Sequence, residues 1–283
     1  MIKVSDIIYG TFELPAIFRE LLNNKSLLRL RNVHQSGAIF LVNPDISHSR
    51  MEHSIGVMLL IRILGGSELE QIAGLLHDVS HTAFSHVGDY VFGNQEEDYH
   101  EKVFEPVLLH SDIPEILERF DYSIDQILRT DFSILEQPLP YLCADRIDYT
   151  LRDALHAKLI TRKAARNFID SITLKRGKIV VNDPMQAQWI SSTLEKLNKE
   201  VFNHPLYVYA NQQLAILIHD FIKKGTLTET DLLKDDVYLL NKIRSTSAGY
   251  EAIKSIKQQK GYPDFLKKGP HLKIKTRYLK PSL

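Results

Sequence analysis

Apolar residues recur along most of this chain with the period of an amphipathic helix. Across residues 51–64, for example, Ile55 and Leu59 lie one turn apart on the same face. The same pattern predicts helices over residues 14–23, 25–35, 51–64, 67–77, 100–109, 114–120, 124–130, 139–155, 184–202 and 206–224. Ser67 followed three residues later by Glu70 has the spacing of a capping box, and Thr228 caps a further short helix.

Residues 172–181 (ITLKRGKIVV) break the helical pattern and predict two short strands. Gly177 between them can adopt a positive φ, as a tight hairpin turn requires. The chain is therefore expected to be mainly α, a helical bundle with a small β-hairpin in its C-terminal half. We expect a core over residues 1–170 and a C-terminal helical region with a basic tail, residues 171–283, packed on it.

The C-terminal 30 residues are basic. From Lys254 onward there are nine Lys or Arg residues and one acid, Asp264. Residues 272–280 alternate, which predicts a half-buried strand with Ile274 and Tyr278 packed on the body, beside the hairpin. Its basic members, Lys273, Lys275 and Arg277, would then stay in water as on a solvated edge strand. The alternative is a contact with an anion or nucleic acid, and we favour the structural interpretation.

Composition excludes several classes of protein. The 283 residues carry 35 Lys+Arg against 35 Asp+Glu, so no overall charge marks a nucleic-acid or membrane binder. No apolar run approaches the length of a membrane span. Cys143 is the one cysteine, which excludes an intrachain disulfide and a cysteine-based zinc site, and we expect it to be buried and structural. With no secretory signal at residues 1–10, a cytoplasmic location is expected.

Histidines cluster in the first third of the chain, where seven of the twelve lie between His34 and His100. In LLHDVSHTAFSHVGD (75–89), His81 follows His77 by one turn, and Asp89 follows His86 by three residues, within reach to orient its ring. A lone histidine is usually a structural residue, but chance rarely places so many ligand types among short apolar helices.

A second polar cluster occupies the predicted helix in CADRIDYTLRD (143–153). Asp145, Asp148 and Arg152 share one face, with Tyr149 and Asp153 along its edge. Such a face is most often solvated. Together with the histidines, however, it favours a divalent metal of borderline-to-hard character, such as iron, manganese, zinc or nickel, since magnesium alone would normally take fewer nitrogens.

These blocks resemble the HD-domain metal-dependent phosphohydrolases, and within them the deoxynucleoside triphosphate triphosphohydrolase branch. The resemblance rests on IIYGTFEL (7–14), LLRLRNVHQSG (27–37), SHSRMEHSIGV (47–57), LLHDVSHTAFSHVGD (75–89), YHEKVF (99–104) and ADRIDYTLRD (144–153). It is good over residues 5–155 and thin to about residue 225. It implies an HD-domain helical bundle that hydrolyses (deoxy)nucleoside triphosphates to nucleoside and triphosphate, assembled as a dimer or larger homo-oligomer.

The resemblance also implies roles for individual residues. The metal ligands would be His53, His77, Asp78 and Asp145. The catalytic histidines would be His81 and His100, with Glu101 and Asp89 as their carboxylate partners. Substrate would contact Gln35, Arg50, His86, Arg146, Tyr149 and Asp153. A magnesium ion could accompany the substrate phosphates.

The sequence departs from the branch at two places. Arg146 stands where the family often has Lys, and an Arg fork presents different geometry to a phosphate. The later helix (205–218) carries no Lys or Arg to hold a polyphosphate, and Lys196 and Lys199 are candidate substitutes. Three alternatives therefore stay open: a nucleotidase or phosphatase acting on mono- or diphosphates, an enzyme for another phosphoester such as a cyclic dinucleotide, and a non-enzymatic metal-bound nucleotide sensor.

Overall fold

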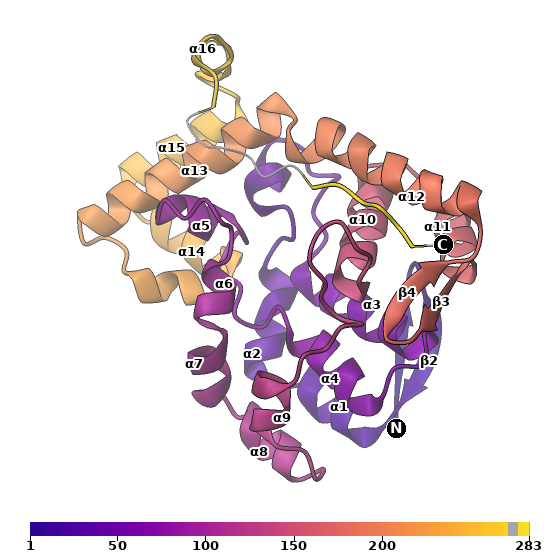
Figure 1. Ribbon diagram of the computed structural model, residues 1–283. Helices are drawn as coiled ribbons and strands as arrows, with labels where there is room; N and C mark the ends of the chain where they lie inside the picture. The colour runs from indigo at the N-terminus through magenta and orange to yellow at the C-terminus, as the bar shows by residue number, and fades with distance from the viewer. Residues whose placement is uncertain (271–276, 283) are drawn as a thin grey trace.

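The computed structural model describes residues 1–270 and 277–282, and helices dominate it (Figure 1). The α-helices are α1 (Ala16–Leu22), α2 (Lys25–Leu28), α3 (Arg50–Ile63), α4 (Glu68–Leu76), α5 (Val87–Val91), α6 (Tyr99–Lys102), α7 (Phe104–Leu109), α8 (Ile113–Glu118), α9 (Ile124–Arg129), α10 (Ala144–His156), α11 (Arg162–Asp170), α12 (Pro184–Leu197), α13 (Pro205–Lys223), α14 (Asp236–Arg244), α15 (Ser247–Lys257) and α16 (Tyr262–Lys268). Short 3₁₀ segments are η1 (Arg29–Asn32), η2 (Gly37–Leu41) and η4 (Glu229–Leu233), and η3 (Asn198–Phe202) is a π-helical turn. The mainly α prediction is confirmed.

Helix starts lie where the capping residues predicted them. The Ser67 hydroxyl accepts a hydrogen bond from the Glu70 amide at 3.2 Å, and the Glu70 carboxylate accepts from the Ser67 amide at 2.7 Å. Thr228 and Asp231 form the same reciprocal pair before η4. These bonds satisfy amides that a helix leaves without partners in its first turn.

Several helix boundaries differ from the prediction. The helix expected over 25–35 is α2, which continues as the 3₁₀ turn η1 and ends at Asn32. The helix expected over 139–155 begins only at Ala144, and Cys143 is its N-cap in extended conformation. Proline disfavours the α conformation in the residue before it, so Pro140 keeps Leu139 out of a helix. The helix expected over 100–109 is divided at Val103 into α6 and α7.

The hairpin predicted over 172–181 is confirmed as β3 (Ile172–Lys175) paired antiparallel with β4 (Lys178–Val181). Arg176 and Gly177 in its turn both have positive φ, 51° and 72°. A second hairpin, β1 (Ile2–Asp6) with β2 (Gly10–Leu14), was not predicted. Its turn is closed by the Asp6 carboxylate, which accepts hydrogen bonds from two backbone amides of the turn.

Two large hydrophobic clusters form most of the interior of the described chain, and a third, of Val208, Tyr209 and Phe265, is much smaller. Of the two large clusters, the larger one joins α1, α3, α4, α10 and α12 with both hairpins, and the smaller one joins α5 and α13 to α14 and α15. Each of the two includes residues from both sides of residue 170. Neither of these two clusters is therefore built from residues 1–170 or 171–283 alone. The division of the chain into these two parts stays a prediction.

The C-terminal segment 277–282 lies along the body near α12 and the β3–β4 hairpin (Figure 1). Of the strand predicted over 272–280, residues 272–276, with Lys273, Ile274 and Lys275, lie outside the described residues. Residues 277–280 form no strand, although Ser282 makes an isolated parallel bridge to Val180 of the hairpin.

The predicted burial of the tail is wrong at two positions. Tyr278 is exposed, and Leu279 is the residue that packs into the larger cluster. Arg277 is turned inward, with only 20% of its side chain exposed. The reason lies in the backbone, because Asn198 of η3 holds the carbonyl of Arg277 and thereby sets which side chains face the body.

None of the helices in the described part of the chain is long and apolar enough to span a membrane.

Candidate active site

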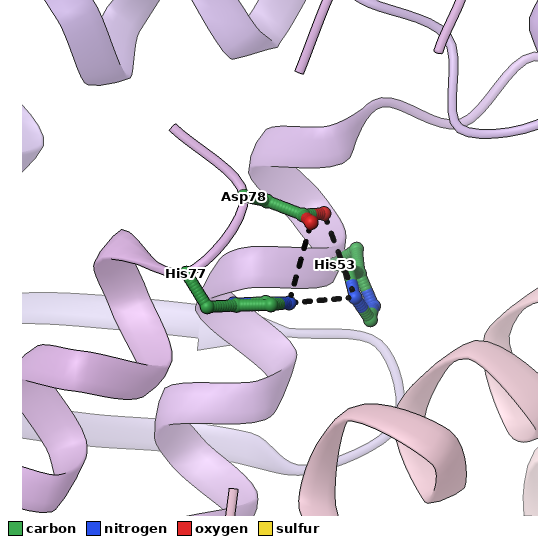
Figure 2. Close-up of side chains that lie close together, drawn as sticks. All are labelled: His53, His77 and Asp78. Atoms are coloured by element: carbon green, nitrogen blue, oxygen red, sulfur yellow. Dashed lines mark hydrogen bonds and ion pairs between the residues drawn. The ribbon is translucent and has the colours of Figure 1, made fainter. Parts of the chain in front are cut away.

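Three helix ends bring the histidine–aspartate group together. His53 projects from the first turn of α3, His77 and Asp78 follow the last residue of α4, and Asp145 lies in the first turn of α10. Figure 2 shows the first three side chains directed at one point. Because α3 packs against both α4 and α10, residues about 90 positions apart in the sequence meet at this point.

The four side chains lie close together around the Nε2 atoms of the two histidines. His53 Nε2 is 3.3 Å from His77 Nε2, 3.0 Å from an Asp145 oxygen and 3.7 Å from an Asp78 oxygen. His77 Nε2 is 3.5 Å from Asp78 and 3.6 Å from Asp145. His53, His77 and Asp78 form one group that could hold a metal ion, and Asp145 lies within 3.6 Å of both imidazoles. Together they offer a donor set for a divalent transition metal.

The hydrogen bonds on the far side of each ring fit a metal ligand. His77 Nδ1 lies 2.8 Å from the Gly74 carbonyl, and His53 Nδ1 lies 2.8 Å from the Asp148 carboxylate. Both acceptors require the proton on Nδ1, so Nε2 is the nitrogen of each ring that faces the aspartates and that would bind a metal once it carries no proton. Metal-ligating histidines typically donate their other N–H in this way.

The pKa values of the clustered histidines and aspartates depend on one another's charges and hydrogen bonds. Burial alone would lower the pKa of His53, but hydrogen bonds to Asp145 and Asp148 raise that pKa to about 10. Burial alone would raise the pKa of Asp78, yet the charges of Arg50 and His77 hold it well below its usual range. For Asp145 too, burial is outweighed, and its hydrogen bonds to His53 and His77 lower its pKa. These two carboxylates are therefore available as anions at neutral pH.

A buried ion-pair chain holds His53 in place. Asp148 accepts two hydrogen bonds from the Arg152 guanidinium, at 2.8 and 2.9 Å, and Arg152 also donates to Asp6 at 2.9 Å. Gly56 leaves the space for this pair, because a Cβ there would lie 2.1 Å from Arg152 and from Asp148. The sequence analysis placed Asp148 and Arg152 on the same helix face as Asp145 but assigned them no role. Their four-residue spacing was the feature that could have indicated this ion pair.

Arg50 is hydrogen-bonded to the histidine–aspartate group, and this leaves its guanidinium less available to a ligand in the cavity. Its guanidinium donates to Asp78 at 2.6 Å and to the Ser85 hydroxyl at 2.7 Å, and its side chain is almost completely buried. The expectation that it holds phosphate would require it to share donors with Asp78.

The remaining histidines form a stack beside the cluster. His81 lies 3.3 Å from Asp78, and its ring stacks on His100 with centroids 3.8 Å apart. Burial and the nearby positive groups lower both pKa values, that of His100 to about 4, so both rings are neutral at pH 7. His100 Nδ1 is buried without a hydrogen-bond partner among the described residues.

Asp89 is hydrogen-bonded to His86, and its implied role as a carboxylate partner of His81 or His100 stays a prediction. Its carboxylate hydrogen bonds to His86, 3.0 Å from Nδ1, and accepts from the Tyr99 amide at 2.9 Å. Asp89 lies three positions after His86, on one helical turn, and this is the pairing that their spacing predicted. Glu101 lines the same cavity as the two stacked histidines, and its partner role stays a prediction.

All six residues expected to contact substrate line one cavity of about 440 Å³: Gln35, Arg50, His86, Arg146, Tyr149 and Asp153. Four of them already have protein partners: Arg50 and His86 in the contacts given above, and Arg146 and Asp153. Arg146 donates to the carbonyls of Tyr141 and Gln137, and Asp153 is 2.6 Å from the His48 ring. Gln35 Oε1 is buried without a partner among the described residues, so it is free to receive a donor from a ligand.

The cavity wall also contains residues that the sequence did not indicate. They are Tyr90, Glu97, Glu136, Phe202, Asn211 and Arg277 among others. None of them was singled out by the spacing of the histidines and aspartates, so only the folded chain assigns them to the site. The volume lies in the range of small-molecule pockets.

Comparison with known proteins agrees with this geometry. A model of the HD domain family matches residues 50–153. The uncharacterized protein YdhJ of Bacillus subtilis is 44% identical over 246 residues, covering 86% of this chain and 76% of that protein. The metal-dependent phosphohydrolase cns2 of Cordyceps militaris is 30% identical over 237 residues, covering 81% of this chain and 68% of that protein.

More distant similarities extend the picture. The deoxynucleoside triphosphate triphosphohydrolase SAMHD1 of Danio rerio is 37% identical over 103 residues, which are 31% of this chain and only 17% of that protein. The crystal structure of a hypothetical protein from Aquifex aeolicus superposes with a TM-score of 0.70 at 25% identity, covering 95% of this chain and 83% of that one. The fold is therefore shared over nearly the whole chain.

Proposed function

The chain belongs to the HD-domain family of metal-dependent phosphohydrolases, and from this premise we propose that it hydrolyses nucleotides, with (deoxy)nucleoside triphosphates as substrates and nucleoside and triphosphate as products. The observation that carries the proposal is the group of two histidines and two aspartates with both Nδ1 atoms turned away from its centre. The partial similarity to a protein named a deoxynucleoside triphosphate triphosphohydrolase supports the substrate class.

In this proposal His53, His77, Asp78 and Asp145 would hold a divalent ion such as iron, manganese, zinc or nickel. A metal so bound polarises a phosphoryl oxygen and lowers the pKa of a coordinated water. Asp148 orients the His53 ring, and Arg50 fixes one oxygen of Asp78. The protein thus fixes the donor atoms before substrate arrives.

In this proposal His81 and His100 transfer the proton. Both rings are neutral at pH 7, so either can accept a proton from an attacking water, and the imidazolium that forms can pass it to the leaving oxygen. Asp78 lies against His81 and would stabilise the charged ring. Gln35 and Tyr149 would contact the nucleoside. A homo-oligomeric assembly, a cytoplasmic location and the absence of nucleic-acid binding stay predictions.

A panel of nucleoside mono-, di- and triphosphates, with the phosphate product identified, tests the proposal. Metal-loaded protein should release inorganic triphosphate from a nucleoside triphosphate. The second candidate, a nucleotidase acting on mono- or diphosphates, is favoured by the residue that α13 contributes to the cavity, the uncharged Asn211. Release of orthophosphate from mono- or diphosphates, with triphosphates intact, would establish that second candidate instead.

The two stacked histidines give a prediction that separates catalysis from metal binding. His81→Ala and His100→Ala should each keep the metal content of the parent but lose about 10²–10⁴-fold in kcat, if that ring is the general acid or base. His110→Ala is the matched control, because His110 is exposed and bonds only locally to the Pro106 carbonyl. Parental turnover in both site variants would remove the catalytic role.

A further inference from the structure

In the proposed function, the phosphates that do not contact the metal require a positively charged side chain in the cavity wall. Helix α13 contributes Asn211 to that wall, and Lys196 and Lys199, the candidate substitutes, line no part of it in the described chain. Lys199 pairs instead with its neighbour Glu200. Substitution from the preceding helix is therefore wrong for these two lysines.

The other arginines of the cavity wall are already used. Arg50 donates to Asp78 and Ser85, and Arg146 donates to two backbone carbonyls. Arg277, from the C-terminal segment, is the third. Within residues 1–270 and 277–282 its guanidinium has one hydrogen-bonded acceptor, a Glu97 oxygen at 2.6 Å. An arginine side chain has five N–H donors in a planar fork, so further donors of Arg277 can reach an anion.

The tail holds Arg277 firmly in the cavity wall. Asn198 donates to the Arg277 carbonyl at 2.6 Å, and the guanidinium lies over the Phe202 ring, 5.6 Å from its centroid. Both residues belong to the π-helical turn η3, and such turns occur frequently at functional sites. Beyond Arg277 the segment is tied down by the Lys280 amide, which donates to Pro140, and by Ser282, whose carbonyl accepts from Val181.

Arg277 lines the same cavity as His77, Asp78 and Asp145, with Tyr149 of α10 also in its wall. The guanidinium is close enough to Tyr149 for the two groups to influence one another electrostatically. Tyr149 lies four residues beyond Asp145, which is about 6 Å along a helix axis. Glu97, itself buried, also accepts from the Tyr90 hydroxyl and so orients the fork.

We propose that Arg277 is the anion-binding residue for the phosphate groups of the substrate that do not contact the metal, and that the C-terminal segment completes the site from outside the HD blocks. This inference rests on the proposed function, since it names the part of the chain that binds the polyphosphate. Glu97 competes with the phosphates for the N–H donors of the Arg277 guanidinium, so the Arg277–Glu97 ion pair determines how tightly phosphate binds.

The test measures binding of inorganic triphosphate to metal-loaded protein by titration calorimetry. Arg277→Gln should weaken binding by about 10–100-fold, because a charge-assisted hydrogen bond to phosphate is lost. Arg277→Lys should restore part of the affinity. Glu97→Gln should strengthen binding, because the competing carboxylate is gone. The control Lys280→Gln, an exposed charge in the same segment, should change affinity by less than about twofold.

The two proposals fail in different ways. If the parent hydrolyses no nucleotide, the proposed function fails, whatever the variants do. If the parent hydrolyses nucleotides but Arg277→Gln binds triphosphate as tightly as the parent, the inference about Arg277 is wrong. If Arg277 and Glu97 had only a structural role, both variants would be less stable to denaturant, and their triphosphate affinities would shift in the same direction or not at all. We expect the affinities of Arg277→Gln and Glu97→Gln to shift in opposite directions.

Discussion

Asp78→Asn should yield a protein with no bound metal and no detectable turnover. Asp78 lies within ligand distance of both His53 and His77, and an amide oxygen lacks the charge that helps neutralise a divalent ion. Loss of a single electrostatic stabiliser costs about 10²–10³ in kcat, and loss of the metal removes both the Lewis acid and the activated water. Elemental analysis after dialysis, with the nucleotide assay in parallel, measures both effects.

Asp153→Asn is the matched control for metal content. Asp153 is a buried aspartate of the same cavity, but it bonds to His48 and lies outside the histidine–aspartate cluster. It should keep the metal stoichiometry of the parent. Full metal content in Asp78→Asn would contradict the proposed ligand set, whereas loss of metal from both variants would point to a general collapse of the site.

Arg152→Met should lower the free energy of unfolding by about 3–5 kcal/mol, because it leaves a buried carboxylate without its partner. Arg152 is only 1% exposed, and both Asp148 and Asp6 depend on its guanidinium. The same change should weaken metal binding by about 10–100-fold, since Asp148 then no longer orients His53 firmly. Denaturant titration and competition with a chelator measure the two effects.

An exposed ion pair provides the comparison. Arg129 lies 3.2 Å from Glu105 with 68% of its side chain exposed, so Arg129→Met should cost less than about 1 kcal/mol. Removing the buried carboxylate as well, in Asp148→Leu with Arg152→Met, should recover part of the stability but not the metal affinity. Equal costs for the two single Arg→Met variants would show that the buried chain does not contribute as described.

Local features of this protein could be predicted from the sequence because neighbouring residues determine them. Ser67 with Glu70 determined where α4 begins, and Gly177 determined the turn of the β3–β4 hairpin. The apolar period located α3 and α13 to within one or two residues. The HD blocks likewise predicted which histidines and aspartates would meet, because in a known family their order along the chain already encodes the packing of α3, α4 and α10.

What the tertiary structure alone decided are the partners that come from distant segments. Nothing in the spacing of residues 277 and 97 indicates an ion pair, and the alternation of the tail predicted Arg277 in water. Its backbone is held by Asn198, 79 residues earlier, and that contact determines which side chains face the cavity. The resemblance implied that Arg50 contacts substrate, but in the folded chain its guanidinium lies 2.6 Å from Asp78. Residue type and spacing predict local structure and the chemistry that is available, whereas the pairing of buried charges depends on which long-range contacts exclude water, and only the folded chain determines those.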